Sequence, residues 1–94
     1  MERMDQMKEV LLFVMAGCPY CREALQWQEE LMEKEPAFRS IPLRIIDETK
    51  EPDFANRFDY YYVPTYYVDG KKLHEGAATE KIVEAVLKTA LQNE

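Results

Sequence analysis

The sequence predicts a mixed α/β fold, in which helices flank a central four-stranded sheet in the order β-α-β-α-β-β-α. Three observations support this fold class. An apolar run at residues 10–15 leads directly into a stretch of helical spacing that continues to Glu35. A second strand-like run follows at residues 41–47, which favours a right-handed βαβ unit with parallel strands. The dipeptide Asp69-Gly70 lies between two short strand-like segments and is typical of a β-hairpin.

Length and charge limit the domain organisation and the partners. The 94 residues are enough for one domain, over residues 1–94, with residues 1–8 as a flexible leader. The net charge of −6 argues against nucleic acid and anionic membranes as partners, because both select for basic patches. The polar, acidic leader is unlike a signal peptide, and the apolar run after it is far shorter than the ~20 residues of a membrane helix. We expect a cytoplasmic monomer.

The first half of the chain carries clear boundary signals. Residues 10–15 are uninterruptedly apolar, as in a central strand that is buried on both faces. Pro19 suits the first position of a helix, where its missing N–H would have had no partner. This helix should end by Glu35, because Pro36 disfavours helical geometry in the residue before it. The strand over residues 41–47 has a proline near its start, where proline is tolerated.

The second half is predicted from shorter segments. Residues 51–58 form a short helix, and Val63-Pro64 interrupts the pattern before a strand at residues 65–68. The Asp69-Gly70 turn leads into a return strand at residues 71–73.

The last helix has both a start signal and an apolar stripe. Gly76 interrupts the return strand, and Thr79 is a suitable N-cap. The apolar positions of this helix are Ile82, Val83, Val86, Leu87, Ala90 and Leu91.

Both cysteines lie at the junction of the first strand and the first helix, as Cys18-Pro19-Tyr20-Cys21. A thiolate, not a thiol, attacks disulfides. Cys18 occupies the N-cap position, where unpaired N–H groups and the helix dipole favour an anion, and Arg22 lies in the same turn. Cys21 falls one turn later, on the apolar stripe. We therefore predict that Cys18 is the nucleophile and that Cys21 is the resolving thiol, which attacks rapidly because it is held close.

Two other interpretations of the cysteine pair stay open. The pair could be half of a zinc site, but the chain has no second pair, and its one histidine, His74, is distant in sequence. Alternatively, both cysteines are structural and unreactive, although an inert core cysteine has no reason to lie at a strand–helix junction. We expect no metal site and no bound cofactor.

The residues Cys18-Pro19-Tyr20-Cys21 resemble the dithiol active site of glutaredoxins. The order of elements and the segment Val63-Pro64-Thr65 resemble the thioredoxin-fold superfamily, from Lys8 onward. The resemblance implies a thioredoxin fold and a cis Val63–Pro64 bond beside the cysteines, where neighbouring backbone pairs with the substrate chain. The alternative is that Pro64 merely starts an edge strand.

The resemblance also implies a substrate groove, to which we add Tyr62 because residues flanking Pro64 should alternate between faces. The substrate-binding residues predicted in this way are Pro19, Tyr20, Tyr62, Val63, Pro64 and Gly76.

The sequence also departs from both families. Met15 stands where glutaredoxins usually carry a lysine that binds glutathione, and Gly76-Ala77 stands where they carry a Gly-Gly pair. Gly17 and Leu12 replace the tryptophan and the buried aspartate that thioredoxins carry before their cysteines. Without that acid, we predict that Cys21 resolves the mixed disulfide more slowly than in a thioredoxin.

The predicted function is thiol–disulfide oxidoreduction on protein disulfides. Glutathione as co-substrate, or alternatively a thioredoxin reductase, would return the electrons. A dimer that bridges an iron–sulfur cluster is disfavoured, because Pro19 stiffens the loop and the glutathione pocket is incomplete. A redox-silent adaptor domain is the remaining alternative.

Overall fold

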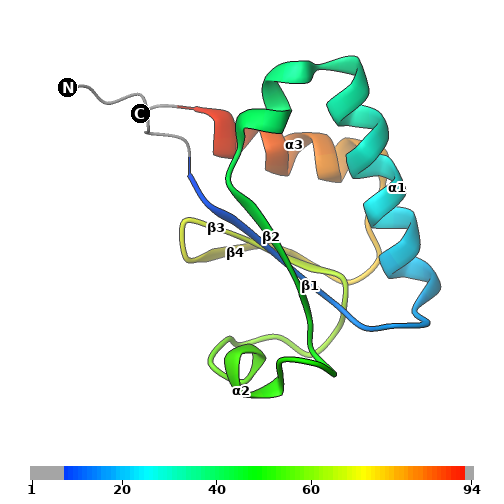
Figure 1. The fold of residues 1–94 in the computed structure, drawn as a ribbon, viewed down its shortest axis with the longest axis vertical. Helices are drawn as coiled ribbons and strands as arrows, with labels where there is room; N and C mark the ends of the chain where they lie inside the picture. The colour runs from blue at the N-terminus through cyan, green and yellow to red at the C-terminus, as the bar shows by residue number, and fades with distance from the viewer. Residues whose placement is uncertain (1–7, 93–94) are drawn as a thin grey trace.

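A computed structural model describes residues 8–92 and has the predicted mixed α/β architecture (Figure 1). Residues 1–7 of the predicted leader lie outside the described residues. Lys8 donates its backbone N–H to the carbonyl of Ala90 at 3.0 Å. The elements are β1 (Val10–Val14), α1 (Pro19–Lys34), the 3₁₀ helix η2 (Pro36–Ser40), β2 (Leu43–Asp47), α2 (Pro52–Ala55), β3 (Thr65–Val68), β4 (Lys71–Glu75) and α3 (Glu80–Leu91).

The four strands form one sheet in the order β2-β1-β3-β4. β1 pairs in parallel with β2, as the predicted βαβ unit requires, and antiparallel with β3. β3 and β4 form the antiparallel hairpin around Asp69-Gly70. All five residues of β1 are buried, which confirms the prediction of a central strand.

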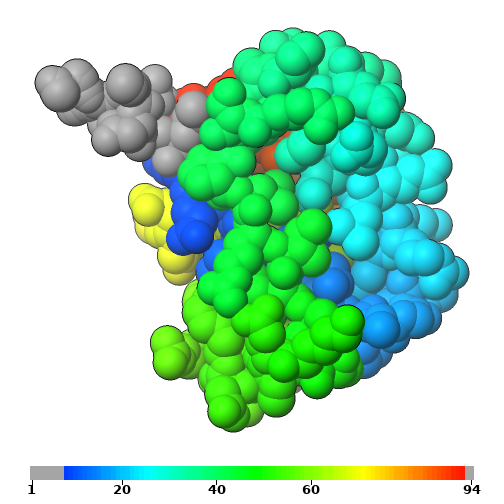
Figure 2. Space-filling view, viewed as in Figure 1, coloured from blue at the N-terminus to red at the C-terminus, as the bar shows by residue number. Residues whose placement is uncertain are grey.

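Side chains of β1 alternate between two hydrophobic clusters, one on each face of the sheet. Leu12 and Val14 belong to the cluster beneath α1 and α3, and Leu11 and Phe13 to the cluster beside α2. Figure 1 accordingly shows α1 and α3 on one side of the sheet and α2 on the other. In the space-filling view, β2 lies in front of part of β1 (Figure 2).

The structure differs from the prediction between α1 and β2. Pro36–Ser40 form a 3₁₀ helix that was not predicted, and β2 begins at Leu43 instead of Ile41. Phe38, in the middle of this turn, is only 3% exposed and packs into the core with α1 and α3. Burial of one aromatic side chain therefore sets the local conformation, and Ile41 caps the turn.

Two further boundaries differ. α2 comprises Pro52–Ala55, which is shorter than the predicted helix over residues 51–58. Phe58 lies beyond the helix, and its ring packs against Phe13 at a centroid distance of 4.9 Å. β4 continues to Glu75 because it pairs with β3 as far as Thr65. The final helix begins as predicted, with the Thr79 hydroxyl accepting the N–H of Ile82 at 3.2 Å.

Candidate dithiol site

The backbone around Cys18 turns from β1 into α1. Gly17 has a φ of 83°, in the left-handed region that glycine adopts without strain, and the Cys18 N–H donates to the Met15 carbonyl at 3.3 Å. Cys18 is the N-cap residue of α1, and Pro19 is the first helical residue, as predicted. The Cys18 sulfur accepts the backbone N–H of Cys21 at 3.4 Å. The sulfur therefore faces the donor end of the helix.

This environment favours the thiolate of Cys18. Partial burial acts to raise the pKa of Cys18, but hydrogen bonds from the Cys21 thiol and from the backbone amides of Cys21 and Tyr20 outweigh it. The positive charge of Arg22 adds a smaller effect in the same direction. As a result, the pKa of Cys18 lies below its ordinary value.

Cys21 has the opposite environment. It is 3% exposed and belongs to the core cluster beneath α1 and α3. Burial is the main reason why its pKa is raised to about 12, and the hydrogen bond to Cys18 and the negative charges of Cys18 and Glu48 contribute as well. The backbone amide of Met15 partly offsets this effect. Proton loss from the pair therefore begins at Cys18.

The Val63–Pro64 peptide bond is cis, as the resemblance implied. The Pro64 side chain is fully buried, and Val63 packs on the same core cluster as Cys18. Gly76, with a φ of 97°, donates its N–H to the Pro64 carbonyl at 2.8 Å. The structure thus brings Gly76 to Pro64, although twelve positions separate them in the sequence.

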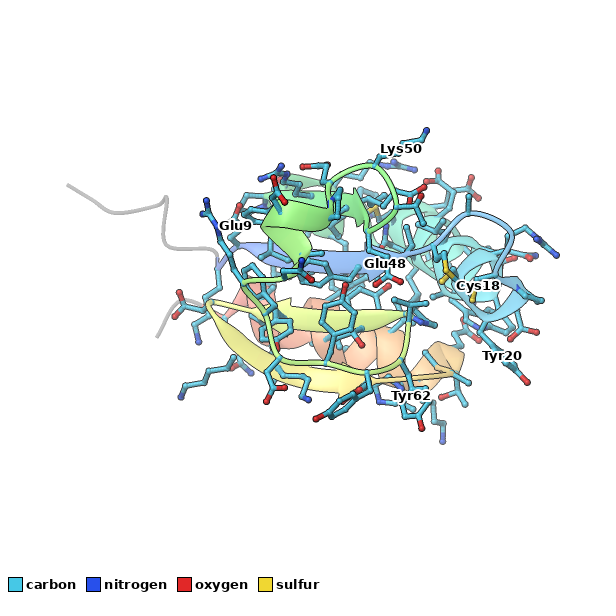
Figure 3. The ribbon with its side chains drawn as sticks, turned by 90° about the horizontal axis from the view of Figure 1, so that it is seen from below. Glu9, Cys18, Tyr20, Glu48, Lys50 and Tyr62 are labelled. Carbon is cyan, nitrogen blue, oxygen red and sulfur yellow. The ribbon has the colours of Figure 1, made fainter. Side chains whose placement is uncertain are left out.

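Two predicted tyrosines lie at the same end of the molecule as Cys18, as Figure 3 shows. Tyr20 and Tyr62 are 55% and 70% exposed. Tyr61 is 85% exposed beside them and was not singled out from the sequence. Residues 59–64 form no strand, so the expected alternation of faces around Pro64 is wrong.

Two carboxylates near this end were also missed. Glu48 follows β2, and its backbone N–H donates to the Val14 carbonyl at the end of β1. Its carboxylate accepts the Tyr60 hydroxyl at 2.7 Å, and burial followed by this contact raises the pKa of Tyr60. Glu75 ends β4 and accepts the backbone amides of Tyr61 and Tyr62. Neither residue has a motif in the sequence, because each reaches the site through strand pairing.

Other candidate features lie elsewhere. A hollow of about 500 Å³, lined in part by Leu31, Phe38 and Leu91, includes neither cysteine. Within residues 8–92, no three His, Cys, Asp or Glu side chains group together as a metal site would require. No helix in the same range is long and apolar enough to cross a bilayer.

Comparisons with known proteins agree with this architecture. The model of a family described as "Thioredoxin domain" matches residues 8–88. The structure is similar to that of the Malassezia sympodialis thioredoxin Mala s 13, with a TM-score of 0.74 and 17% identity over 93% of this chain and 77% of that one. It is also similar to Fasciola hepatica thioredoxin, with a TM-score of 0.68 and 18% identity over 90% and 82% of the two chains.

A third similar structure is oxidised thioredoxin O1 from Arabidopsis thaliana, with a TM-score of 0.69 and 18% identity over 94% of this chain and 81% of that one. At these identities, the structural likeness shows the fold. A search of curated proteins returned no significant match. The family match, the fold and the cysteine pair at the start of α1 agree, and this chain belongs to the thioredoxin domain family.

Proposed function

We propose that this protein is a thiol–disulfide oxidoreductase that reduces protein disulfides through Cys18 and Cys21. The observation that carries the proposal is that the pKa values of two thiols within one helical turn are shifted in opposite directions. The pKa of Cys18 is lowered at the N-terminus of α1, and that of Cys21 is raised inside the core. Two inert structural thiols would not require different pKa values. Thiol–disulfide exchange does require one thiol that ionises readily, because the thiolate is the attacking species.

The proposed reaction has two exchange steps. The Cys18 thiolate attacks one sulfur of a substrate disulfide, forms a mixed disulfide and releases the other substrate sulfur as a thiolate. Cys21 then loses its proton, and its thiolate attacks the Cys18 sulfur. This attack breaks the mixed disulfide, releases the second substrate thiolate and leaves a Cys18–Cys21 disulfide. Two electrons pass from the protein dithiol to the substrate disulfide.

We propose that the segment around the cis bond holds the substrate chain during the first step. Val63 and Cys18 pack on one core cluster, which supports a position for the Val63 backbone beside the mixed disulfide. The exposed rings of Tyr20 and Tyr62 supply apolar contact area with few rotatable bonds. We propose that Pro19, Pro64 and Gly76 shape the backbone of the same groove.

For the electron donor, we propose a thioredoxin reductase in preference to glutathione. Met15 provides no cation before the cysteines, where glutaredoxins usually carry a lysine. The chain therefore lacks, at this position, the positive charge that binds a glutathione carboxylate. We further propose that the protein acts as a monomer in the cytoplasm, where a dithiol is kept reduced.

The proposal is tested by reduction of a disulfide-bonded peptide with two recharging systems. One contains NADPH and thioredoxin reductase, and the other contains NADPH, glutathione and glutathione reductase. We expect turnover with the first system, and Cys21→Ser should accumulate a mixed disulfide that Cys18→Ser does not form. Turnover with glutathione alone would overturn the donor assignment. Absence of any mixed disulfide in Cys21→Ser would overturn the reaction and favour an adaptor domain.

A further inference from the structure

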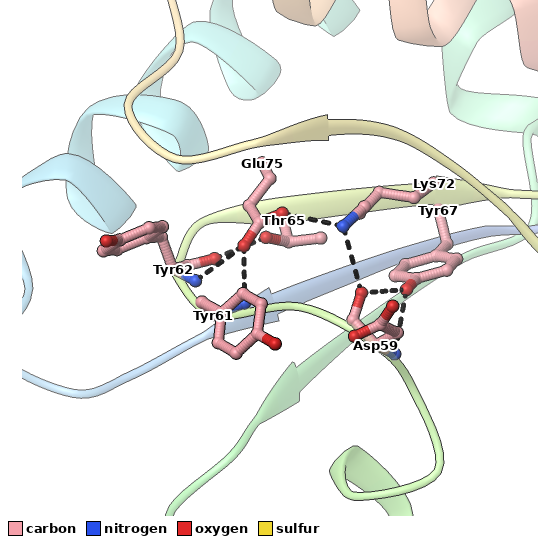
Figure 4. A network of polar contacts seen from close by, with 7 residues as sticks. All are labelled: Asp59, Tyr61, Tyr62, Thr65, Tyr67, Lys72 and Glu75. Atoms are coloured by element: carbon pink, nitrogen blue, oxygen red, sulfur yellow. Dashed lines mark hydrogen bonds and ion pairs between the residues drawn. The ribbon is translucent and has the colours of Figure 1, made fainter.

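The loop that precedes the cis bond is held by one carboxylate. Oε2 of Glu75 accepts the backbone amide of Tyr62 at 3.0 Å and also the amide of Tyr61 (Figure 4). Oε1 of Glu75 accepts the Lys72 ammonium at 2.7 Å. Lys72 also donates to the Asp59 carbonyl at 3.1 Å, so both ends of the loop are connected to β4.

Two successive backbone amides that point at one oxygen form an anion-binding concavity. Together with the Lys72 ammonium, they make a receptor suited to a carboxylate. In this protein a residue of the same chain occupies it, and the Glu75 side chain is only 20% exposed there. Lys72, followed by the Tyr61 amide, lowers the pKa of Glu75 to about 2, so the occupant is ionised at neutral pH.

This receptor is connected to the cis Val63–Pro64 segment at three points. Tyr62 directly precedes the cis peptide, and Glu75 is the cross-strand partner of Thr65, which follows it. Glu75 is also followed by Gly76, which bonds to Pro64. The views in Figures 3 and 4 agree in placing the Tyr62 side chain toward the start of α1.

We propose that Glu75 is a specificity-determining residue that selects polypeptide disulfides over small acidic disulfides such as glutathione disulfide. It does so by filling the carboxylate receptor made by the Tyr61 and Tyr62 amides and Lys72. A glutathione carboxylate would have to displace Glu75, or it would be repelled by the negative charge of Glu75. A neutral peptide segment brings no competing anion and can use the exposed tyrosine rings instead. This inference rests on the proposed oxidoreductase function and identifies its substrate class.

Two substitutions change the local charge in opposite directions. Glu75→Gln keeps an oxygen acceptor for the loop but leaves the Lys72 cation unpaired. Lys72→Gln leaves the Glu75 anion unpaired. Because both variants weaken the same network, loss of loop structure alone would move them in the same direction. Glu29→Gln and Lys88→Gln are the matched controls, since each removes one partner of a surface ion pair away from the loop.

The quantity to measure is the ratio of second-order rate constants for glutathione disulfide and for a neutral disulfide-bonded peptide. We expect Glu75→Gln to raise this ratio about tenfold at low ionic strength, the lower end of electrostatic effects on encounter rates. Lys72→Gln should lower the ratio, and the two controls should leave it near the wild-type value. Both shifts should shrink as salt screens the charges.

Three results would count against the inference. A ratio in Glu75→Gln equal to that in Glu29→Gln would overturn it. A change of the ratio in the same direction in Glu75→Gln and Lys72→Gln would also overturn it, and would show that Glu75 only holds the loop. In both cases, peptide reduction by the wild-type protein would leave the proposed function intact. If the wild type reduces neither disulfide, the proposed function fails and this inference fails with it.

Discussion

The acidities of Cys18 and Cys21 follow from their places in one helical turn. The sulfur of Cys18 lies at the N-terminus of α1, where it accepts the Cys21 amide at 3.4 Å. The positive charge of Arg22 also stabilises its thiolate. Cys21 lies within the turn and is almost fully buried, and the negative charge of Glu48 disfavours its thiolate. Leu12, on the adjacent strand, is completely buried and carries no group that could accept a proton. In the proposed reaction, we therefore predict that ionisation of Cys21 limits release of the mixed disulfide.

The negative charge of Glu48 is one of the causes that raise the pKa of Cys21. Glu48→Gln removes a negative charge beside Cys21, lowers the pKa of Cys21 and increases the thiolate fraction at neutral pH. We expect mixed-disulfide release to accelerate about 1.4- to fivefold, which corresponds to the 0.2–1 kcal/mol typical of exposed charge pairs. Stopped-flow measurement of substrate release provides the rate.

Glu51→Gln is the control, because Glu51 pairs with Arg44 and is not among the groups that shift the pKa of Cys21. Slower release in Glu48→Gln would contradict the prediction, and would mean that Glu48 takes the proton from Cys21.

At the scale of elements, one buried polar contact connects α1 to the sheet. The Tyr66 hydroxyl of β3 donates to the Gln28 side-chain oxygen of α1 at 2.9 Å. Tyr66 is 0% exposed and Gln28 is 6% exposed, so water cannot replace either partner. This contact connects β3 to the buried face of α1, which also carries Cys21.

Tyr66→Phe should destabilise the reduced protein by about 1–3 kcal/mol, because the Gln28 oxygen would remain buried without a donor. Chemical denaturation gives the free energy of unfolding. The double variant Tyr66→Phe with Gln28→Met removes both polar groups and should recover most of that loss. If the double variant is no more stable than Tyr66→Phe, the hydrogen bond is not the source of the effect.

Elements whose signals are local could be predicted from the sequence. Pro19 and Thr79 mark the starts of α1 and α3 because each acts within its own first turn. The 3₁₀ helix was missed because its conformation depends on burial of Phe38 among residues distant in sequence. The length of α2 was wrong for a similar reason, since Phe58 packs on Phe13 instead of continuing the helix.

The order of strands places the parts of the site at one end of the whole molecule. β1 pairs with β3 in the centre of the sheet, so the loop after β1 and the loop before β3 meet. The cysteines and Val63–Pro64 could be predicted from the sequence because motifs mark them. Glu48 and Glu75 could not, because only the pairing of β2 with β1 and of β4 with β3 brings them there.

The stability of the whole fold is linked to the ionisation of Cys18. A thiol whose pKa is lower in the folded protein than its ordinary value of 9.0 contributes stability that is fully present above that value. The contribution is lost as the pH falls through the folded pKa. The free energy of unfolding of the reduced protein, relative to Cys18→Ser, should therefore rise with pH toward 9.0.

Cys21 gives the opposite slope at higher pH, because its folded pKa of about 12 exceeds the unfolded value. Above 9.0, stability relative to Cys21→Ser should decline as the unfolded chain loses its proton first. Denaturation at a series of pH values tests both slopes. A pH-independent difference between the wild type and Cys18→Ser would contradict the lowered pKa of Cys18.

α1 makes Cys18 the more acidic thiol of the pair, and the pH dependence of alkylation measures the acidity of each thiol. The rate is measured on Cys18 in Cys21→Ser, whose hydroxyl can still donate to the sulfur, and on Cys21 in Cys18→Ser. We predict a midpoint for Cys18 below the ordinary cysteine value of 9.0 and a midpoint for Cys21 above it. A Cys18 midpoint at or above 9.0, or faster alkylation of Cys21 at neutral pH, would contradict the account.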